Sequence, residues 1–347
     1  MVCAICSIRI FGIEMLETVP TPSARPAATL EIEGLTIEFR ARGRVQRVVD
    51  RVNLRIAPGE IVGLIGESGS GKTLTALSVL GLLPRGARIR SGLIRLSGTS
   101  LLDLSEDEWR AIRGDRVAFI PQDALRALNP VFPIGLQVGE PLNIHRGTPW
   151  QIAKHKAIEL LRSVHLRDAE ERAEEYPHQF SGGMQQRAMV AMGLALEPQL
   201  LIADEPTTAL DVTVQAQVLK LLREIRDAHG TSILFITHDL GVVADLCDRV
   251  YVMYAGLGIE EGSVEHIFYR PSHPYTQALL RATPTIRAVE KELVSIPGQI
   301  PSPDNLPTGC RFADRCPVAF ERCGEEPPPF QVGGGHLARC WRCATPQ

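Results

Sequence analysis

The sequence has 347 residues, of which 44% are hydrophobic and 22% are charged, and its 37 basic and 40 acidic side chains give a net charge of −3. This composition is typical of a folded globular protein of about two domains, and it excludes a disordered or fibrous chain. The near-neutral balance argues against binding to extended nucleic-acid duplexes, and no apolar run reaches the roughly 18 residues that cross a bilayer.

The first expected elements form a β layer. Residues 1–28 are predicted to be an irregular leader, because Pro, Ala and Ser occur there without periodicity. Apolar and polar residues alternate at 30–39, and the pattern returns at 48–60 before a turn at Pro58 and Gly59. This alternation predicts a small antiparallel sheet.

Later segments predict an α/β core. Short apolar runs bounded by turn or polar residues are typical of buried parallel strands, and apolar residues at helical spacing predict helices between them. The runs are residues 61–65, 200–203 and 233–237, and the helical patterns are residues 152–166 and 209–225. We therefore expect an α/β fold with an antiparallel β subdomain and a helical subdomain at about 123–195.

A phosphate-binding motif follows the first of these apolar runs. The segment GESGSGKT fits G-x-x-x-x-G-K-[ST] and is expected to lie between a strand and a helix through Leu80. Its glycines let backbone N–H groups approach a triphosphate, Lys72 adds a positive charge at the β and γ oxygens, and Thr73 offers a hydroxyl to Mg²⁺. The residues predicted to bind ATP here are Gly66, Glu67, Ser68, Gly69, Ser70, Gly71, Lys72 and Thr73.

Two carboxylates end the apolar run at 200–203. Asp204 and Glu205 are expected at the carboxyl edge of the sheet, where α/β proteins bind their ligands. With a phosphate loop upstream, Asp204 is predicted to hold Mg²⁺. Glu205 is predicted to accept a proton from the water that attacks the γ-phosphate.

A second phosphate clamp is expected before the helix at 184–196. Ser181, Gly182 and Gly183 supply a hydroxyl and bare backbone N–H groups at the start of that helix, where its dipole favours anions. The segment FSGGMQQR at 180–187 resembles the signature motif of ATP-binding-cassette ATPases. In that family two cassettes meet head to tail, so each ATP lies between the P-loop of one and the signature of the other.

Three further site residues follow from this resemblance. Gln122 matches the family's loop glutamine, which reaches Mg²⁺ and the attacking water. His238 matches the switch histidine, which contacts the γ-phosphate. Phe39 is the candidate for stacking on adenine, with Arg42 as the alternative.

Closer similarity points to one branch of the family. The segments YPHQ at 176–179, THDLGVVA at 237–244 and HPYT at 273–276 resemble the ATP-binding subunits of oligopeptide and dipeptide importers. The tail segments GCRF at 309–312 and RCP at 315–317 resemble the C-terminal module of those subunits. The similarity extends from about Leu30 to Trp341.

The resemblance implies an ATPase that drives uptake of di- or oligopeptides. Its cassette is expected at 29–265 and its small Cys-rich C-terminal module at 266–347. The implied partners are two transmembrane permease subunits, a second ATPase subunit (the same chain or a paralogue) and an extracytoplasmic solute-binding protein. The expected location is the cytoplasmic face of the cell membrane, with ATP and Mg²⁺ as cofactors.

Four cysteines of the tail form a candidate metal site. Cys310, Cys316, Cys323 and Cys340 give the pattern C-x5-C-x6-C-x16-C, and four thiolates suit a [4Fe–4S] cluster or a tetrahedral Zn²⁺. The first two intervals are longer than zinc pairs usually have, and the resemblance implies an iron–sulfur cluster. Zinc and reduced free thiols are the alternatives, and Cys343 is an alternative ligand.

Two other functions are compatible with parts of the sequence. A nickel or other small-solute importer uses the same ATPase subtype, and no residue here contacts cargo. A soluble cassette acting on nucleic acid is disfavoured, because the interval from Lys72 to Ser181 has no room for a long coiled coil. We expect no nucleic-acid partner.

Overall fold

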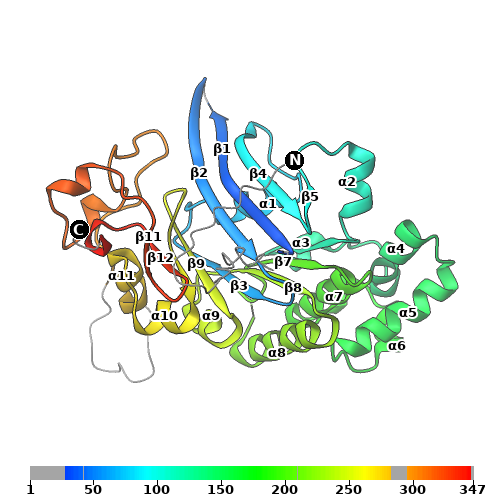
Figure 1. Ribbon diagram of the computed structural model, residues 1–347. Coiled ribbons are helices and arrows are strands. Elements are labelled where there is room, and N and C mark those ends of the chain that lie inside the picture. Colours follow the sequence, from blue (N-terminus) through cyan, green and yellow to red (C-terminus); the bar gives the residue numbers. More distant parts are fainter. Residues whose placement is uncertain (1–27, 42, 209, 283–294, 345–347) are drawn as a thin grey trace, which may run out of the picture.

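The computed structural model describes residues 28–41, 43–208, 210–282 and 295–344, so the expected leader and Arg42 lie outside it except for residue 28. Its strands form a four-stranded and an eight-stranded sheet (Figure 1). The strands are β1 (Leu30–Ala41), β2 (Arg44–Ile56), β3 (Ile61–Ile65), β4 (Ala87–Leu96), β5 (Thr99–Ser100), β6 (Val117–Ile120), β7 (Leu200–Asp204), β8 (Ser232–Ile236), β9 (Arg249–Tyr254), β10 (Leu257–Ser263), β11 (Phe330–Gly333) and β12 (His336–Ala338). The helices are α1 (Lys72–Val79), α2 (Glu106–Ile112), α3 (Ala124–Ala127), α4 (Ile134–Arg146), α5 (Trp150–Ser163), α6 (Ala169–Glu174), α7 (Gly182–Leu194), α8 (Val212–His229), α9 (Leu240–Leu246), α10 (Val264–Tyr269) and α11 (Pro274–Ala282).

The eight-stranded sheet has the order β11-β12-β10-β9-β3-β8-β7-β6. Neighbouring strands from β9 to β6 run parallel, and every residue of β3, β7 and β8 is buried. The three apolar runs are thus confirmed as buried parallel strands. Since β3, β8, β7 and β6 are adjacent and parallel, the residues that follow them meet at one edge of the sheet.

The four-stranded sheet has the order β2-β1-β4-β5 and lies above the larger sheet in Figure 1. β1 pairs antiparallel with β2, which confirms the predicted β layer. β1 also pairs antiparallel with β4, so it is an interior strand of this sheet. The carbonyl of Val48 in β2 and the side chain of Val49 pack close to Gly71, which brings this sheet against the phosphate loop.

Helices α3 to α7 lie between β6 and β7 along the chain, and Figure 1 shows α4, α5 and α6 at one end of the molecule. The predicted helix at 152–166 is found at Trp150–Ser163. Its buried residues Ala153, Ala157 and Leu161 repeat every four residues and face the apolar core. This helical insert is at the opposite end of the molecule from the C-terminal segment, which comprises residues 266–282 and 295–344 (Figure 1).

The C-terminal segment extends the main sheet. β12 pairs antiparallel with β10, with Glu260 opposite Ala338, and β11 pairs with β12. Behind this pairing, Nε2 of His336 lies 2.7 Å from Oε1 of Glu260, and both side chains are buried. Strands of three and four residues thus join this segment edge-on to the strands of the cassette.

His273 makes folding stability depend on pH. It is buried, its Nδ1 accepts the N–H of Tyr275 at 3.0 Å, and its own N–H donates to Glu260. Burial lowers the pKa of His273 to about 4, although Glu260 opposes the shift. Because the unfolded state binds the proton near pH 6.5 and the folded state does not, the free energy of unfolding should fall by about 3 kcal/mol between pH 6.5 and pH 4. Urea unfolding across that range measures the loss, and it should shrink in a His273→Asn variant.

Candidate active site

The phosphate loop connects β3 to α1. Gly66 has a φ of +149°, and a Cβ there would lie 2.2 Å from the carbonyl oxygen of Met253. Gly71 has a φ of +102° and caps α1. Only glycine fits the close approach at Gly66 without displacing backbone. The loop therefore keeps the open geometry that exposes N–H groups to an anion.

Backbone carbonyl groups of this loop hold the side chain of Lys72 in place. Its Nζ donates to the carbonyl oxygens of Gly66 at 2.7 Å and Glu67 at 3.0 Å, and only 7% of the residue is exposed. Burial lowers the pKa of Lys72, and the nearby carboxylates of Glu205, Asp204 and Glu67 counteract the effect. The ammonium group is thus placed before any nucleotide arrives.

Asp204 lies beside Thr73 at the end of β7. Burial raises the pKa of Asp204, and a hydrogen bond from Thr73 opposes that shift. Glu205 is a second carboxylate beside it and raises the pKa further. A hydroxyl next to a buried carboxylate is a suitable oxygen ligand pair for Mg²⁺, which would also relieve the crowded negative charge.

Glu205 is the centre of a polar cluster. Nε2 of Gln122 donates to its Oε2 at 3.0 Å, and Nδ1 of His238 lies 3.2 Å from its Oε1. The backbone of Glu205 has a φ of +48°, a conformation that costs a non-glycine residue about 1–3 kcal/mol. The structure therefore brings together the three residues predicted as catalytic, which follow β6, β7 and β8.

Thr208 is a member of this cluster that the sequence analysis missed. Its Oγ1 donates to Oε2 of Glu205 at 3.0 Å. A hydroxyl residue three positions after a strand-end carboxylate is the local signal that could have identified it, because a turn brings positions i and i+3 together.

The signature segment lies apart from the P-loop of the same chain. Oγ of Ser181 accepts the N–H of Met184 and caps α7, and Ser181 and Gly182 are exposed. A Cβ on Gly183 would lie 2.5 Å from the side chain of Val214 in α8. Among the described hydrogen bonds, none joins residues 181–183 to residues 66–73. The signature segment therefore faces solvent and not the P-loop of its own chain.

Comparison with known proteins identifies the family. A model described as ABC transporter matches residues 49–208, and one described as oligopeptide/dipeptide transporter, C-terminal region, matches residues 259–323. A Sinorhizobium fredii protein named as a probable peptide ABC transporter ATP-binding protein is 48% identical over 316 residues, which are 90% of this chain and 94% of that protein. The chain belongs to the ATP-binding proteins of peptide ABC transporters.

Other relatives agree with this membership. A Brucella abortus protein named as a candidate peptide import ATP-binding protein is 46% identical over 92% of this chain and 96% of its own length. Among solved structures, the dimeric cassette MJ0796 bound to ADP and phosphate is 28% identical and covers 68% of this chain and 98% of its own, with a TM-score of 0.62. The cassette cbiO1 of Clostridium perfringens, part of the transporter complex cbiONQ, is 25% identical with a TM-score of 0.60. The match covers 70% of this chain and 92% of cbiO1. This cassette is accordingly an ATPase.

Phe39 of the cassette lies in β1, opposite Gln46 in β2 and Ala87 in β4. Its ring is 3.7 Å from the position that a Cβ on Gly86 would take. The alternative, Arg42, is outside the described residues. The adenine contact stays a prediction.

The tail cysteines of the cassette line a common pocket. Burial raises the pKa of Cys310 to about 11, and the three thiols of Cys323, Cys340 and Cys316 add to the effect. Apolar side chains, including Phe312 and Trp341, complete the wall. As the side chains stand, however, the described residues contain no group of three or more His, Cys, Asp or Glu that could hold a metal ion.

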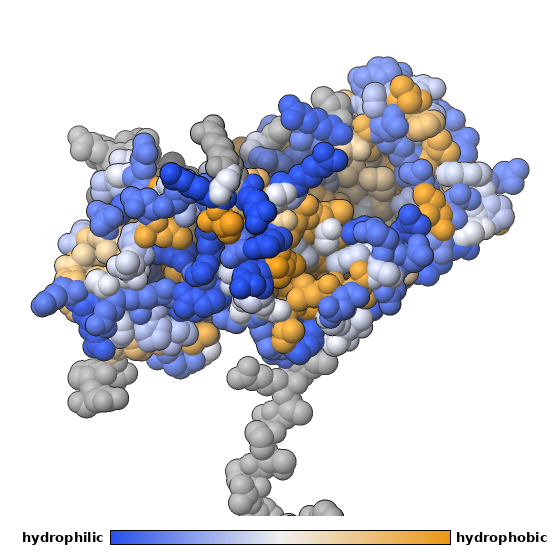
Figure 2. All heavy atoms as spheres, turned by 90° about the horizontal axis from the view of Figure 1, so that it is seen from above, coloured by the Kyte–Doolittle hydropathy of each residue, from blue (hydrophilic) through white to orange (hydrophobic). Residues whose placement is uncertain are grey.

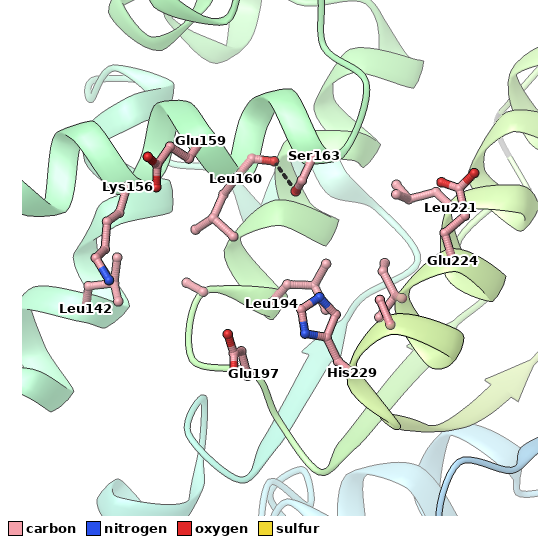
Figure 3. Close-up of a pocket in the computed structure, with 13 residues that line it drawn as sticks. Leu142, Lys156, Glu159, Leu160, Ser163, Leu194, Glu197, Leu221, Glu224 and His229 are labelled. Atoms are coloured by element: carbon pink, nitrogen blue, oxygen red, sulfur yellow. Dashed lines mark hydrogen bonds between the residues drawn. The ribbon is translucent and has the colours of Figure 1, made fainter.

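A separate cavity of about 390 Å³ lies between the helical insert and α8 (Figure 3). Lys156 and Glu159 of α5 and Glu224 and His229 of α8 lie around an apolar floor that includes Leu160. None of the residues predicted to bind ATP or Mg²⁺ lines it. The cavity is therefore not the nucleotide site.

Within the described part of the chain, none of the helices has both the length and the apolar character needed to span a membrane.

Proposed function

We propose that this chain is the ATP-hydrolysing subunit of an importer that takes up di- or oligopeptides across the cytoplasmic membrane. The observation that carries the proposal is the cluster of Gln122, Glu205 and His238 beside a complete P-loop. The peptide cargo is supported by the names of relatives that are 46–48% identical over nearly the whole chain. The alternative is an importer of nickel or another small solute, and a cargo assay distinguishes the two functions.

The residues around the P-loop have complementary roles in this proposal. Residues 66–73 bind the phosphates of ATP, and Thr73, Asp204 and Gln122 provide oxygen ligands for Mg²⁺. The bound ion would neutralise charge on the β and γ phosphates. Glu205 accepts the proton of the water that attacks the γ-phosphorus, while the bond to the β–γ bridging oxygen breaks and ADP leaves. His238 orients Glu205 through their 3.2 Å contact and contacts the γ-phosphate.

The active unit in this proposal is a head-to-tail pair of cassettes. Ser181, Gly182 and Gly183 are outside the reach of their own P-loop, whereas their exposure makes them available to a second subunit. MJ0796, which shares this fold, was solved as a dimer. One ATP would then be bound by the P-loop of one cassette and by the signature of the other.

The helical insert is the proposed docking surface for the permease subunits. Its start exposes large apolar side chains, with exposed fractions of 69% at Val131, 46% at Phe132 and 37% at Leu136. Figure 2 shows apolar residues gathered in and beside a hollow on the upper face, toward the end that carries this insert. Two permeases contacting these residues would hold the cassette at the cytoplasmic face of the membrane. An extracytoplasmic solute-binding protein would deliver the peptide.

We further infer that Cys310, Cys316, Cys323 and Cys340 hold a [4Fe–4S] cluster in a C-terminal region of residues 266–347, with the cassette proper at 29–265. Four thiols that line one largely apolar pocket are a donor set suited to such a cluster. Bringing all four to ligand distance requires side-chain movement from the positions described above. Anaerobically purified protein should contain iron and absorb near 400 nm. Stoichiometric zinc without that absorbance would contradict the cluster.

A pull-down tests the importer. Tagged Glu205→Gln protein with ATP and Mg²⁺ is added to mildly solubilised native membranes. We expect it to retain two polytopic subunits and a second cassette, because a closed dimer holds its partners longest. A Phe132→Ser variant in the same background should lose the polytopic subunits and keep the second cassette. Recovery of nucleic acid or of soluble partners alone would contradict the proposal.

A further inference from the structure

Glu67 is an unexpected residue for a loop that surrounds a triphosphate, because its carboxylate repels the phosphates. The structure holds this residue at three points. Its N–H donates to the hydroxyl oxygen of Tyr275 at 3.0 Å, and its carbonyl oxygen accepts from Lys72 at 3.0 Å. Its carboxylate oxygens lie 3.1 and 3.2 Å from the guanidinium of Arg315. Two of the three contacts thus come from the C-terminal segment.

Arg315 is itself fixed by contacts from that segment and from Tyr254 of β9. Its side chain is only 5% exposed, and its Nε donates to the carbonyl oxygen of Pro297 at 2.8 Å. Its guanidinium also donates to the hydroxyl of Tyr254 at 3.2 Å and lies 5.9 Å from the ring centre of Phe312. With rotation restricted at so many points, Arg315 is a rigid anchor for Glu67.

Tyr275 is fixed in the same aromatic cluster. It is completely buried, and its ring centre is 4.7 Å from that of Tyr254 and 5.4 Å from that of Phe312. Aromatic pairs at these separations pack favourably. The hydroxyl that accepts the N–H of Glu67 therefore has little freedom to move.

A second connection supports the wall of the loop. Arg311 contacts the carboxylate of Asp50 and the carbonyl oxygen of Ala255, both in buried positions. The neighbouring Gly256 donates its N–H to the carbonyl oxygen of Ser70 at 3.0 Å and accepts the N–H of Asp50 at 2.8 Å. The C-terminal segment therefore contacts the P-loop directly and through the turn that packs against it.

We propose that Arg315 is a positioning residue for ATP binding, acting through Glu67. Together with Tyr275 it fixes Glu67, whose carbonyl oxygen in turn holds the ammonium group of Lys72. Its positive charge also offsets the carboxylate of Glu67 beside the phosphates. This inference rests on the proposed binding of ATP by residues 66–73, and it makes nucleotide affinity depend on the C-terminal segment.

Binding of a fluorescent ATP analogue to the full-length protein tests the inference. Arg315→Gln should weaken binding by roughly 5- to 150-fold, the usual range for coupling between two sites. The KM for ATP should rise by a similar factor while kcat at saturating ATP changes little, because the Glu205 cluster is untouched. Arg315→Lys, which keeps the charge, should give an intermediate affinity.

A double substitution separates positioning from a general loss of structure. In a Glu67→Gln background, Arg315→Gln should change the affinity by less than about twofold, because a residue acting through Glu67 has no effect without it. An undiminished effect in that background would overturn the proposal. Arg322→Gln is the matched control, since Arg322 is in the same segment and stacks 3.9 Å from the ring centre of Trp341. It should bind ATP like the unmodified protein.

Tyr275→Phe covers the case in which Arg315→Gln does not fold. It removes only the oxygen that accepts the N–H of Glu67, and it should weaken ATP binding in the same direction. Unchanged affinity in folded Arg315→Gln would overturn the proposal, and where that variant does not fold, unchanged affinity in Tyr275→Phe would overturn it. If the unmodified protein binds no ATP, the proposed function itself fails, which is a distinguishable result.

Discussion

Glu205→Gln is expected to reduce the rate of ATP hydrolysis by at least about a hundredfold, the lower end of what a positioned general base contributes. The amide has the shape of the carboxylate, so it can keep contacts with His238 and Thr208, but it cannot accept the proton of the attacking water. ATP affinity should therefore be preserved, and the dimer that forms with ATP should persist. Phosphate release measures the first effect, and size-exclusion chromatography with ATP measures the second.

The control for this substitution is Glu224→Gln. Glu224 is a surface carboxylate on α8 whose contacts are with His165 and Lys220, and none of the Glu205 cluster is among them. Its turnover should match that of the unmodified protein. Turnover of the Glu205→Gln variant within tenfold of normal would assign the proton acceptor to another group.

Lys72→Ala is expected to weaken ATP binding by about 10- to 150-fold, because hydrogen bonds to charged groups contribute about 1.5–3 kcal/mol and charge-assisted contacts to phosphate oxygens are among the strongest in proteins. The effect should be large here because Lys72 is held in place by the carbonyl oxygens of Gly66 and Glu67, so little ordering is needed on binding. Equilibrium titration with the ATP analogue measures the loss.

Lys220→Ala is the matched control for Lys72. Lys220 is a lysine on α8 with a side chain that is 73% exposed. Its removal should leave ATP affinity unchanged. If Lys72→Ala retained normal affinity with an unchanged thermal unfolding midpoint, the phosphate contacts would have to come from the backbone alone.

The local hydrophobic pattern was sufficient to predict the parts of the site that directly follow a continuous apolar strand. The P-loop comes after β3 and the pair Asp204 and Glu205 ends β7, and both strands are continuous apolar runs. Gln122 and His238 were reached through family resemblance. For Gln122 no local pattern was available, since β6 has only four residues and such a short run does not distinguish strand from helix.

Contacts between distant segments were not predictable in this way. The pairing of β10 with β12 joins Glu260 to Ala338 through strands too short to show a periodic pattern. The ion pair of Glu67 with Arg315 has no signal in the spacing of either residue, because burial and backbone geometry decide which charges meet. The cysteine spacing likewise indicated a metal-ligand set without showing how the thiols are placed.

The separation of Glu67 and Arg315 along the chain has a consequence for protein synthesis. The two residues are 248 positions apart, so Arg315 is made well after Glu67. At translation rates of about 5–20 residues per second, the P-loop exists for roughly 10 to 50 seconds before Arg315 is made. For most of that interval Glu67 has neither Tyr275 nor Arg315 to hold it, because Tyr275 itself lies 208 positions after Glu67. A nascent chain would therefore bind ATP weakly until the C-terminal segment has emerged and folded.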